Sequence, residues 1–243
     1  MPLIEPGDDL IEPWTDTVPY HGRRFLLLGA TGSGKSTFIE ALAGSGQRLG
    51  ISGSTLESVT QDVQTFRLLN LRPVYLVDTP GFSDVKMSEI QILNKIHEWQ
   101  ATNGYIHCVF YFVRITDKRI GRSARRLIKI IKGLGLSHHS LIIVTTMWDT
   151  IHEEEARKRA DYYFAYLRDF VWEFQIKWGA QILRFENTQI SAFEVLRASK
   201  PWSGLSDDLF HLRDGTSSIA PIVYEDLLDR IQNASQQRMM RIL

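Results

Sequence analysis

The sequence predicts an α/β fold, a three-layer α/β/α sandwich built around a mostly parallel sheet. Short apolar runs, typical of buried parallel strands, alternate along the chain with amphipathic segments. The 243 residues are enough for one such domain, and 44% apolar and 23% charged residues are ordinary for a globular protein. Strands that alternate with helices form βαβ units, whose sheet is covered by helices on both faces.

The predicted elements follow one another in a regular order. The expected parallel strands are Phe25–Leu28, Val74–Val77, Ile106–Val113, Leu141–Val144 and Gln181–Phe185. The expected helices are Ser36–Ala43, Ser88–Gln100, Arg122–Lys132, His152–Lys177 and Ser191–Ala198. The more polar segment Val59–Leu69 is predicted to be an edge strand.

We expect three parts along the chain. Residues 1–20 contain four prolines and five acidic residues without periodicity, which indicates a loosely attached tail. Residues 21–200 form the main domain. Residues 201–243 form a helical extension, because Val223, Leu227, Leu228 and Ile231 recur at helical spacing after a polar stretch. This extension is either a terminal helix packed on the domain or the start of an assembly contact.

Composition excludes several classes of protein. Lys plus Arg and Asp plus Glu both number 28, whereas a nucleic-acid binder usually has a basic surplus. The single cysteine, Cys108, excludes an internal disulfide framework and fits a reducing compartment. The acidic N-terminus does not resemble a secretory signal, and no apolar stretch approaches the roughly 20 residues of a membrane helix. A cytoplasmic protein without a transmembrane segment is expected.

The segment His152–Lys177 shows the clearest helix pattern. Thr150 and Glu153 have the spacing of a capping box, and Glu154 and Lys158 form a favourable i,i+4 pair. An aromatic stripe then recurs every four residues: Tyr162, Tyr166, Phe170, Phe174 and Trp178. We expect this stripe to be a helix face packed on the core, the alternative being a surface for partner docking or ligand stacking.

The segment from Gly29 to Ser36 matches the phosphate-binding pattern G-x-x-x-x-G-K-[ST], between a predicted strand and a predicted helix. Its glycines let backbone N–H groups approach phosphate oxygens, and the helix start adds its positive dipole end. Lys35 is expected to reach the β- and γ-phosphates, and the Ser36 hydroxyl to ligate Mg²⁺. The predicted contacts are Gly29, Ala30, Thr31, Gly32, Ser33, Gly34, Lys35, Ser36 and Thr37. A P-loop nucleotide-binding fold is therefore predicted.

Asp78-Thr-Pro-Gly81 closes the predicted strand Val74–Val77. Asp78 would emerge beside the phosphate loop and hold Mg²⁺, and the Gly81 N–H would meet the γ-phosphate. The alternative is an ordinary turn, because Asp-x-Pro-Gly is also good turn chemistry.

Thr146-Met-Trp-Asp149 ends the strand predicted at Leu141–Val144. The carboxylate of Asp149 can accept hydrogen bonds from guanine N1 and the exocyclic N2, a donor pair that adenine lacks. The alternative is that Asp149 only caps the next helix. GTP or GDP with Mg²⁺ is the expected ligand.

These motifs resemble a translation-factor-type GTPase domain. The closest likeness is to the AIG1/GIMAP group, related to septins and to chloroplast import GTPases, and it covers roughly residues 24–198. Two stretches are similar to fungal members: 111–119 and 142–149. The resemblance implies a first-switch threonine that ligates Mg²⁺ and acts with Lys35 in catalysis, assigned to Thr60 rather than Thr55. It also implies a base-covering residue after Gln181–Phe185, either Asn187 or Ser191-Ala192, with Asn187 preferred.

The sequence departs from the usual GTPase pattern at two places. Thr146 and Met147 replace the Asn-Lys of the base-reading motif, which predicts reduced guanine affinity. Phe82 stands where Ras-type GTPases place the glutamine that orients the attacking water, so slow hydrolysis is expected. The family likeness implies nucleotide-dependent homodimers or filaments across the nucleotide face.

Seven cations form a basic cluster: Lys118, Arg119, Arg122, Arg125, Arg126, Lys129 and Lys132. The cluster is expected to be the solvated face of a helix, the alternatives being an acidic-partner or anionic-membrane patch, or an arginine that acts across a dimer. For the whole chain the leading hypothesis is a GTP-binding switch with slow hydrolysis. A nucleotide-gated scaffold and an ATP-dependent phosphotransferase are the alternatives.

Overall fold

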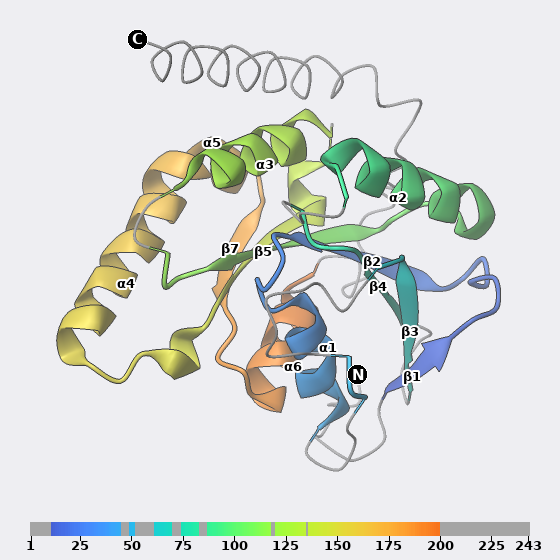
Figure 1. Ribbon diagram of the computed structural model, residues 1–243, viewed down its shortest axis with the longest axis horizontal. Helices are drawn as coiled ribbons and strands as arrows, with labels where there is room; N and C mark the ends of the chain where they lie inside the picture. The colour runs from blue at the N-terminus through green and yellow to red at the C-terminus, as the bar shows by residue number, and fades with distance from the viewer. Residues whose placement is uncertain are drawn as a thin grey trace, which may run out of the picture.

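Residues 11–44, 49–51, 61–69, 74–82, 87–117, 120–134 and 136–199 are described by a computed structural model, and they contain a sheet of seven strands (Figure 1). In spatial order the strands are β1 (Ile11–Trp14), β3 (Gln64–Leu68), β4 (Val74–Asp78), β2 (Arg23–Gly29), β5 (Cys108–Arg114), β6 (Leu141–Thr146) and β7 (Gln181–Arg184). The β1–β3 and β3–β4 pairings are antiparallel, and the other pairings among these strands are parallel. The predicted fold class is confirmed. The segment Val59–Leu69 contains β3, but the prediction of an edge strand is wrong, because β3 pairs with β4 on one side and with β1 on the other.

Helices cover both faces of the sheet. One face carries α1 (Lys35–Ala43) and α6 (Gln189–Ala198). The other face carries α2 (Glu89–Asn103), α3 (Arg122–Gly133), α4 (Glu154–Tyr166) and α5 (Glu173–Lys177). Three shorter turns are η1 (His138–Ser140), η2 (Trp148–Thr150) and the π-helical η3 (Leu167–Val171).

Two apolar cores lie on the two faces because successive strand residues point in opposite directions. Along β5, Val109 and Tyr111 belong to the core under α2, α3 and α4, whereas Phe110 and Phe112 belong to the core under α1 and α6. The thiol of Cys108 is buried in the second core, and this burial raises its pKa. Within the described part of the chain, no helix has the length and hydrophobicity that a bilayer span requires.

The tail predicted for residues 1–20 is wrong for its second half. Ile11–Trp14 is an edge strand whose Ile11 is fully buried and whose Trp14 packs edge-on against Tyr75, with Arg67 over its ring. The strand escaped prediction because four residues give little periodicity, and its proline is tolerated only because the strand lies at the edge. Residues 1–10 and the predicted extension 201–243 lie outside the described residues.

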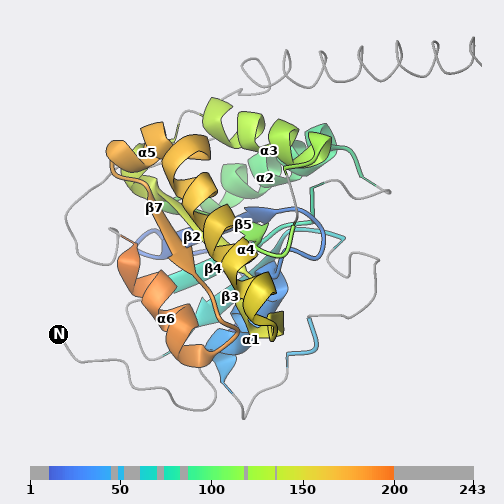
Figure 2. The ribbon, with the colours of Figure 1, turned by 90° about the vertical axis from the view of Figure 1, so that its left-hand side faces the viewer.

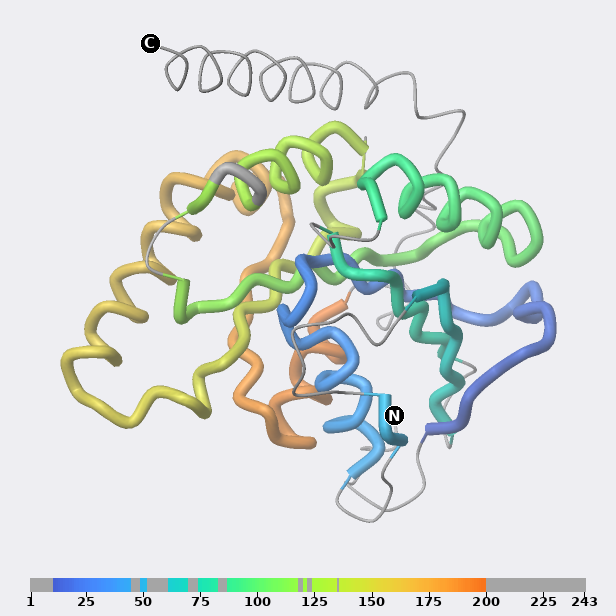
Figure 3. Tube along the Cα trace, viewed as in Figure 1, coloured from blue at the N-terminus to red at the C-terminus, as the bar shows by residue number. Residues whose placement is uncertain are grey.

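The predicted helix His152–Lys177 is not continuous. The N–H of Trp172 donates to the carbonyl of Leu167, an i→i+5 bond of 2.9 Å that makes η3 a π turn between α4 and α5 (Figure 3). The predicted capping box is also wrong, because Glu153 is the N-cap and the Thr150 hydroxyl donates to the carbonyl of Met147.

The aromatic stripe was predicted to face the core, and this prediction is wrong. Because of the π turn, the side chains of Leu167 and Trp172 both point toward the sheet, where they are fully buried. The stripe residues therefore lie on the outside, with exposed fractions of 76% for Tyr162, 74% for Phe170 and 59% for Phe174. Trp178 and Tyr166 are also exposed.

Candidate nucleotide-binding site

The predicted site residues meet at the edge of the sheet where the parallel strands end. β2 ends at Gly29 and β4 at Asp78, while β6 ends at Thr146. Gly29 is level with Phe112 of β5, and the end of β5 is level with Thr146. In open α/β sheets, ligands bind beyond the carboxyl ends of the strands, so this edge is the expected position of a nucleotide.

The phosphate loop needs its glycines for two different reasons. Gly32 and Gly34 adopt left-handed backbone angles, with φ of 71° and 93°, which favour glycine. At Gly29 the backbone is ordinary, but an added Cβ would lie 2.7 Å from the carbonyl oxygen of Phe112. Gly34 is also the N-cap of α1 and has no side chain, so the first N–H groups of the helix face the loop without a side chain over them.

Lys35 brings a buried cation into this loop. Its Nζ donates to the carbonyl oxygens of Gly29 and Ala30 at 3.2 and 3.3 Å. Burial lowers the pKa of its ammonium group, and the nearby carboxylate of Asp78 partly offsets this shift. Because a cation out of water lacks much of its solvation, it attracts an anion more strongly than a surface lysine does.

The predicted magnesium ligands Ser36 and Asp78 meet directly. The Ser36 hydroxyl donates to Oδ2 of Asp78 over 2.9 Å, and Asp78 is fully buried. A hydroxyl and a carboxylate are oxygen donors of the kind that Mg²⁺ prefers, and this ion usually takes its other ligands from water and phosphate. The residues present therefore fit Mg²⁺. The third predicted ligand, Thr60, lies outside the described residues, as does Thr55.

The segment after Asp78 is bonded to the phosphate loop. The Phe82 N–H donates to the carbonyl of Gly29, and the Thr31 N–H donates to the carbonyl of Phe82. Gly81 lies so close to Thr31 that an added Cβ would come within 2.6 Å of its backbone nitrogen. The side chain of Phe82 is fully buried in the core between the sheet and α2.

The base-reading residues are also brought together. The Asn187 side-chain amide donates to Oδ2 of Asp149 over 3.0 Å, and both residues are exposed. Asn187 and Met147 have φ of 54° and 65°, left-handed values that mark a tight turn at each position. Thr146 is different: it is buried, and its hydroxyl donates to the carbonyl of Ser33, so it braces the phosphate loop. Thr37 is half-buried in the first turn of α1.

Sequence reasoning missed the support of Asp149. The neighbouring Trp148 is buried, donates to the Thr145 hydroxyl, and has Arg157 and Arg184 over its ring at 5.1 and 4.2 Å. Cation–π contacts of this kind hold the turn in place. The sequence did not indicate this cation–π contact. Arg157 lies four residues after Glu153, a spacing that predicts an ion pair with Glu153 instead.

The basic cluster is only partly a solvated face. Arg125, Lys129 and Lys132 are exposed, but Arg126 is buried and forms an ion pair with Glu89 at the start of α2. The expectation of a solvated face is therefore wrong for Arg126, which turns inward because Glu89 offers a buried partner. Lys118 and Arg119 lie outside the described residues.

Comparison with known protein families gives a match over the phosphate loop and the segment around Asp78. The profile of the family described as 50S ribosome-binding GTPase matches residues 24–147. No curated protein matches the chain in sequence.

Several solved structures share the fold. A dimerization-deficient mutant of Toc33 from Arabidopsis thaliana gives a TM-score of 0.60 at 14% identity, covering 79% of this chain and 88% of that one. Toc33 in complex with GDP and Mg²⁺ gives 0.58 at 15% identity, with the same coverage. NFeoB from S. thermophilus bound to GDP·AlF4⁻ and K⁺ gives 0.50 at 14% identity, covering 77% of this chain and 65% of that one.

Proposed function

The chain belongs to the 50S ribosome-binding GTPase family, and from that premise we propose that it binds GTP and GDP with Mg²⁺ at the edge described above. The observation that carries the proposal is the hydrogen bond between Ser36 and Asp78, beside the buried ammonium group of Lys35. A metal-binding oxygen pair and a desolvated cation at the end of a phosphate loop together match a magnesium–triphosphate complex. The Toc33 structure that contains GDP and Mg²⁺ has the same fold.

Each part of the site has a role in this proposal. N–H groups from Gly29 to Thr37 hold the phosphates, and Lys35 reaches the β- and γ-phosphates. Ser36 and Asp78, with Thr60, hold Mg²⁺, which when bound neutralises charge on the phosphoryl oxygens. The N–H of Gly81 senses the γ-phosphate.

Asp149 provides the preference for guanine in this proposal. Its carboxylate accepts from N1 and N2 of guanine, and the amide of Asn187 holds that carboxylate in position. Met147 cannot supply the contacts of the lysine that the usual motif has, which reduces guanine affinity. Adenine would present an acceptor to the carboxylate and would bind more weakly.

We further propose that hydrolysis is slow and that the protein is a cytoplasmic switch of the AIG1/GIMAP type. Phe82 is buried and has no group that could orient water. In the chloroplast translocon components atToc33 and psToc159, dimerization is important for GTPase activity. A homodimer or larger oligomer through the nucleotide face would likewise complete this site, which makes a nucleotide-gated scaffold the second candidate function.

Calorimetric titration with GTP, ATP and xanthosine triphosphate, each with Mg²⁺, tests the proposal. Lys35→Ala should weaken GTP binding about 10- to 150-fold, because a hydrogen bond to a charged group is worth about 1.5–3 kcal/mol. Asp149→Asn should lower GTP affinity and raise affinity for xanthosine triphosphate, whose C2 carbonyl accepts from the new amide. The exposed Lys158→Ala is the control and should bind as the wild type does.

Equal affinity of the wild type for ATP and GTP would contradict the base assignment and favour a phosphotransferase. Retained GTP affinity in Lys35→Ala would contradict the site itself. Light scattering with GTP, GDP and no nucleotide tests the scaffold function by measuring the molar mass of the protein. The same molar mass in all three conditions would exclude a nucleotide-gated scaffold.

A further inference from the structure

The aromatic stripe is a large apolar surface with no role in the nucleotide site. Its members are exposed by 40% to 76% of their area along α4, η3 and α5. Aromatic side chains of this size each bury about 150–250 Å² when covered, and a contiguous exposed apolar patch marks an interaction site. The stripe therefore indicates a surface that another element covers.

The inner side of the same arm packs on the core of the domain. Trp172 packs against Tyr111, with ring centroids 5.5 Å apart, and Lys132 donates to the carbonyl of Val171. The arm is thus fixed to the domain by its inward face. Phe170 and Phe174 lie on the other side. Phe174 meets the ring of His138 edge-on and Phe170 stacks on Tyr166, but both remain largely exposed.

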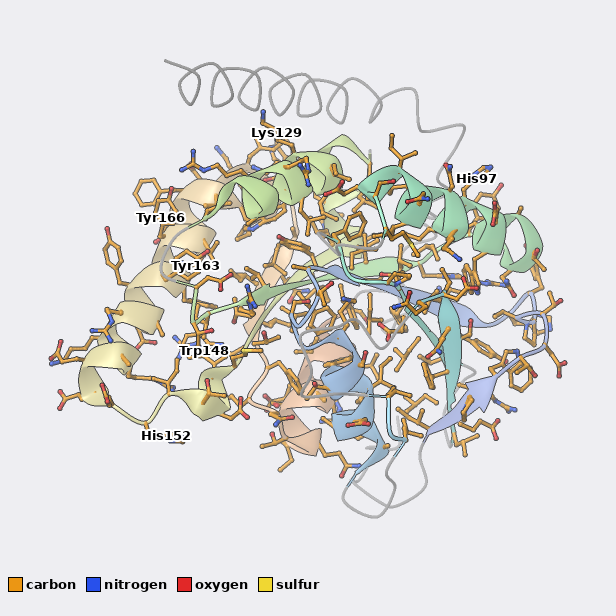
Figure 4. The ribbon with its side chains drawn as sticks, in the orientation of Figure 1. His97, Lys129, Trp148, His152, Tyr163 and Tyr166 are labelled. Carbon is orange, nitrogen blue, oxygen red and sulfur yellow. The ribbon has the colours of Figure 1, made fainter. Side chains whose placement is uncertain are left out.

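A groove of about 1170 Å³ adjoins the N-terminal end of the stripe. Its walls include Ile115, Ile120, Ile151 and the stripe residues Tyr162 and Tyr166, together with Tyr163, whose pKa burial raises to about 12. Figure 4 shows Tyr163 and Tyr166 on α4 and Lys129 on α3. Charged side chains also line the groove, among them Asp117, Arg125 and Arg159, so the tyrosines of α4 pass from the stripe into a groove of mixed polarity.

The chain leaves the described domain beside the other end of the stripe. The side-chain amide of Gln181 donates to the carbonyl of Ala198, the last residue of α6, over 2.7 Å. Gln181 follows Trp178 by only three residues. Figure 2 shows α6 beside β7, with α5 above them on the other face of the sheet. The last described residue, Ser199, therefore lies beside β7, the strand that follows the stripe.

The sequence of the extension can reach the stripe and has an apolar face to place on it. Between Lys200 and Ile222 the chain can span about 70 Å, and the stripe from Tyr162 to Trp178 is about 24 Å long at 1.5 Å per helical residue. The apolar positions Val223, Leu227, Leu228 and Ile231 need a partner surface. The three acids of the segment 222–231 fall on the opposite side of the predicted helix, which would remain in water.

We propose that the segment from Ile222 onward docks on the aromatic stripe of its own chain, with Val223, Leu227, Leu228 and Ile231 against the aromatic rings. The stripe is then a docking surface for an internal helix. This contact is independent of the nucleotide site.

Hydroxyl-radical footprinting of the full-length chain tests this contact, because it measures the solvent exposure of individual aromatic side chains. The double variant Leu227→Asp/Leu228→Asp should raise labelling of Phe170, Phe174 and Trp178 about tenfold, which corresponds to about 1.4 kcal/mol. The matched control Asn233→Asp/Gln236→Asp adds the same charge on the opposite side of the predicted helix. It should leave the labelling as in the wild type.

Equal labelling of the stripe in all three proteins would overturn the proposal. Protection that grows with protein concentration and persists in Leu227→Asp/Leu228→Asp would also overturn it, by assigning the stripe to a second copy. Protection that occurs only with anionic lipid vesicles would overturn it in favour of a membrane. A disulfide between cysteines placed at Phe170 and Leu227, but not at Phe170 and Asn233, would support it.

Discussion

The nucleotide edge, where β2, β4 and β6 end at Gly29, Asp78 and Thr146, is packed differently from the arm α4–η3–α5. At the edge, small residues and buried polar groups leave almost no spare room: Gly81 touches Thr31, and Thr146 braces Ser33. In the arm, large aromatic rings lie on both sides of the helix, and only the inner side is covered by the described residues. The edge therefore holds backbone segments close together around a buried cation, whereas the arm leaves a wide apolar surface exposed.

Replacing Trp172 gives the largest expected effect and tests whether the inner side of the arm is a true core. Trp172→Ala should lower the free energy of unfolding by about 3–5 kcal/mol, because a buried aromatic ring leaves a cavity. The control is Tyr20→Ala, whose side chain is 90% exposed and which should change stability by less than about 0.5 kcal/mol. Urea denaturation measures both variants. Similar losses of unfolding free energy in Trp172→Ala and Tyr20→Ala would mean that the arm does not pack on the sheet.

A methyl group at Gly81 tests how tight the nucleotide edge is. Gly81→Ala should weaken GTP binding by roughly tenfold, because its Cβ overlaps the Thr31 backbone and overpacking costs about 1–3 kcal/mol. Gly121→Ala is the matched control, since an added Cβ there meets no atom within 4 Å. Fluorescence titration with labelled GTP compares the two. Unchanged affinity in Gly81→Ala would show that the edge has room to adjust.

The smallest expected effect is a dependence of the unfolding free energy on pH, caused by the buried ammonium group of Lys35. Burial lowers its pKa in the folded protein below the ordinary value of 10.5. Between these two pKa values the unfolded chain keeps a proton that the folded protein has lost, so stability without nucleotide rises with pH in that window. Below the lowered pKa the cost of burying the charge is constant.

Lys35→Met removes this titration and serves as the reference. The difference in unfolding free energy between wild type and Lys35→Met should rise with pH in the window, by at most about 1.4 kcal/mol per pH unit. Urea denaturation at a series of pH values measures the slope. A flat difference would show that the ammonium group is well solvated in the folded protein.

Much of the fold and part of the candidate site could be predicted from the sequence. The strand–loop–helix unit around Gly29–Ser36 and the strand before Asp78 lie within short stretches, so neighbouring residues specify them through periodicity and turn chemistry. The edge strand Ile11–Trp14 and the π turn at Leu167–Val171 could not be predicted. Each depends on distant partners, namely β3 for the strand and the core under Trp172 for the turn.

By itself, the sequence determined that strands and helices alternate and that phosphate-binding chemistry follows the first long strand. Only the tertiary structure decided that Asp149 meets Asn187, that Arg126 turns inward to Glu89 and that the aromatic stripe faces outward. The physical reason is the separation along the chain of the residues that determine each feature. Backbone conformation and amphipathic period are set by adjacent residues, whereas side-chain pairing and burial depend on residues that folding brings together from far along the chain.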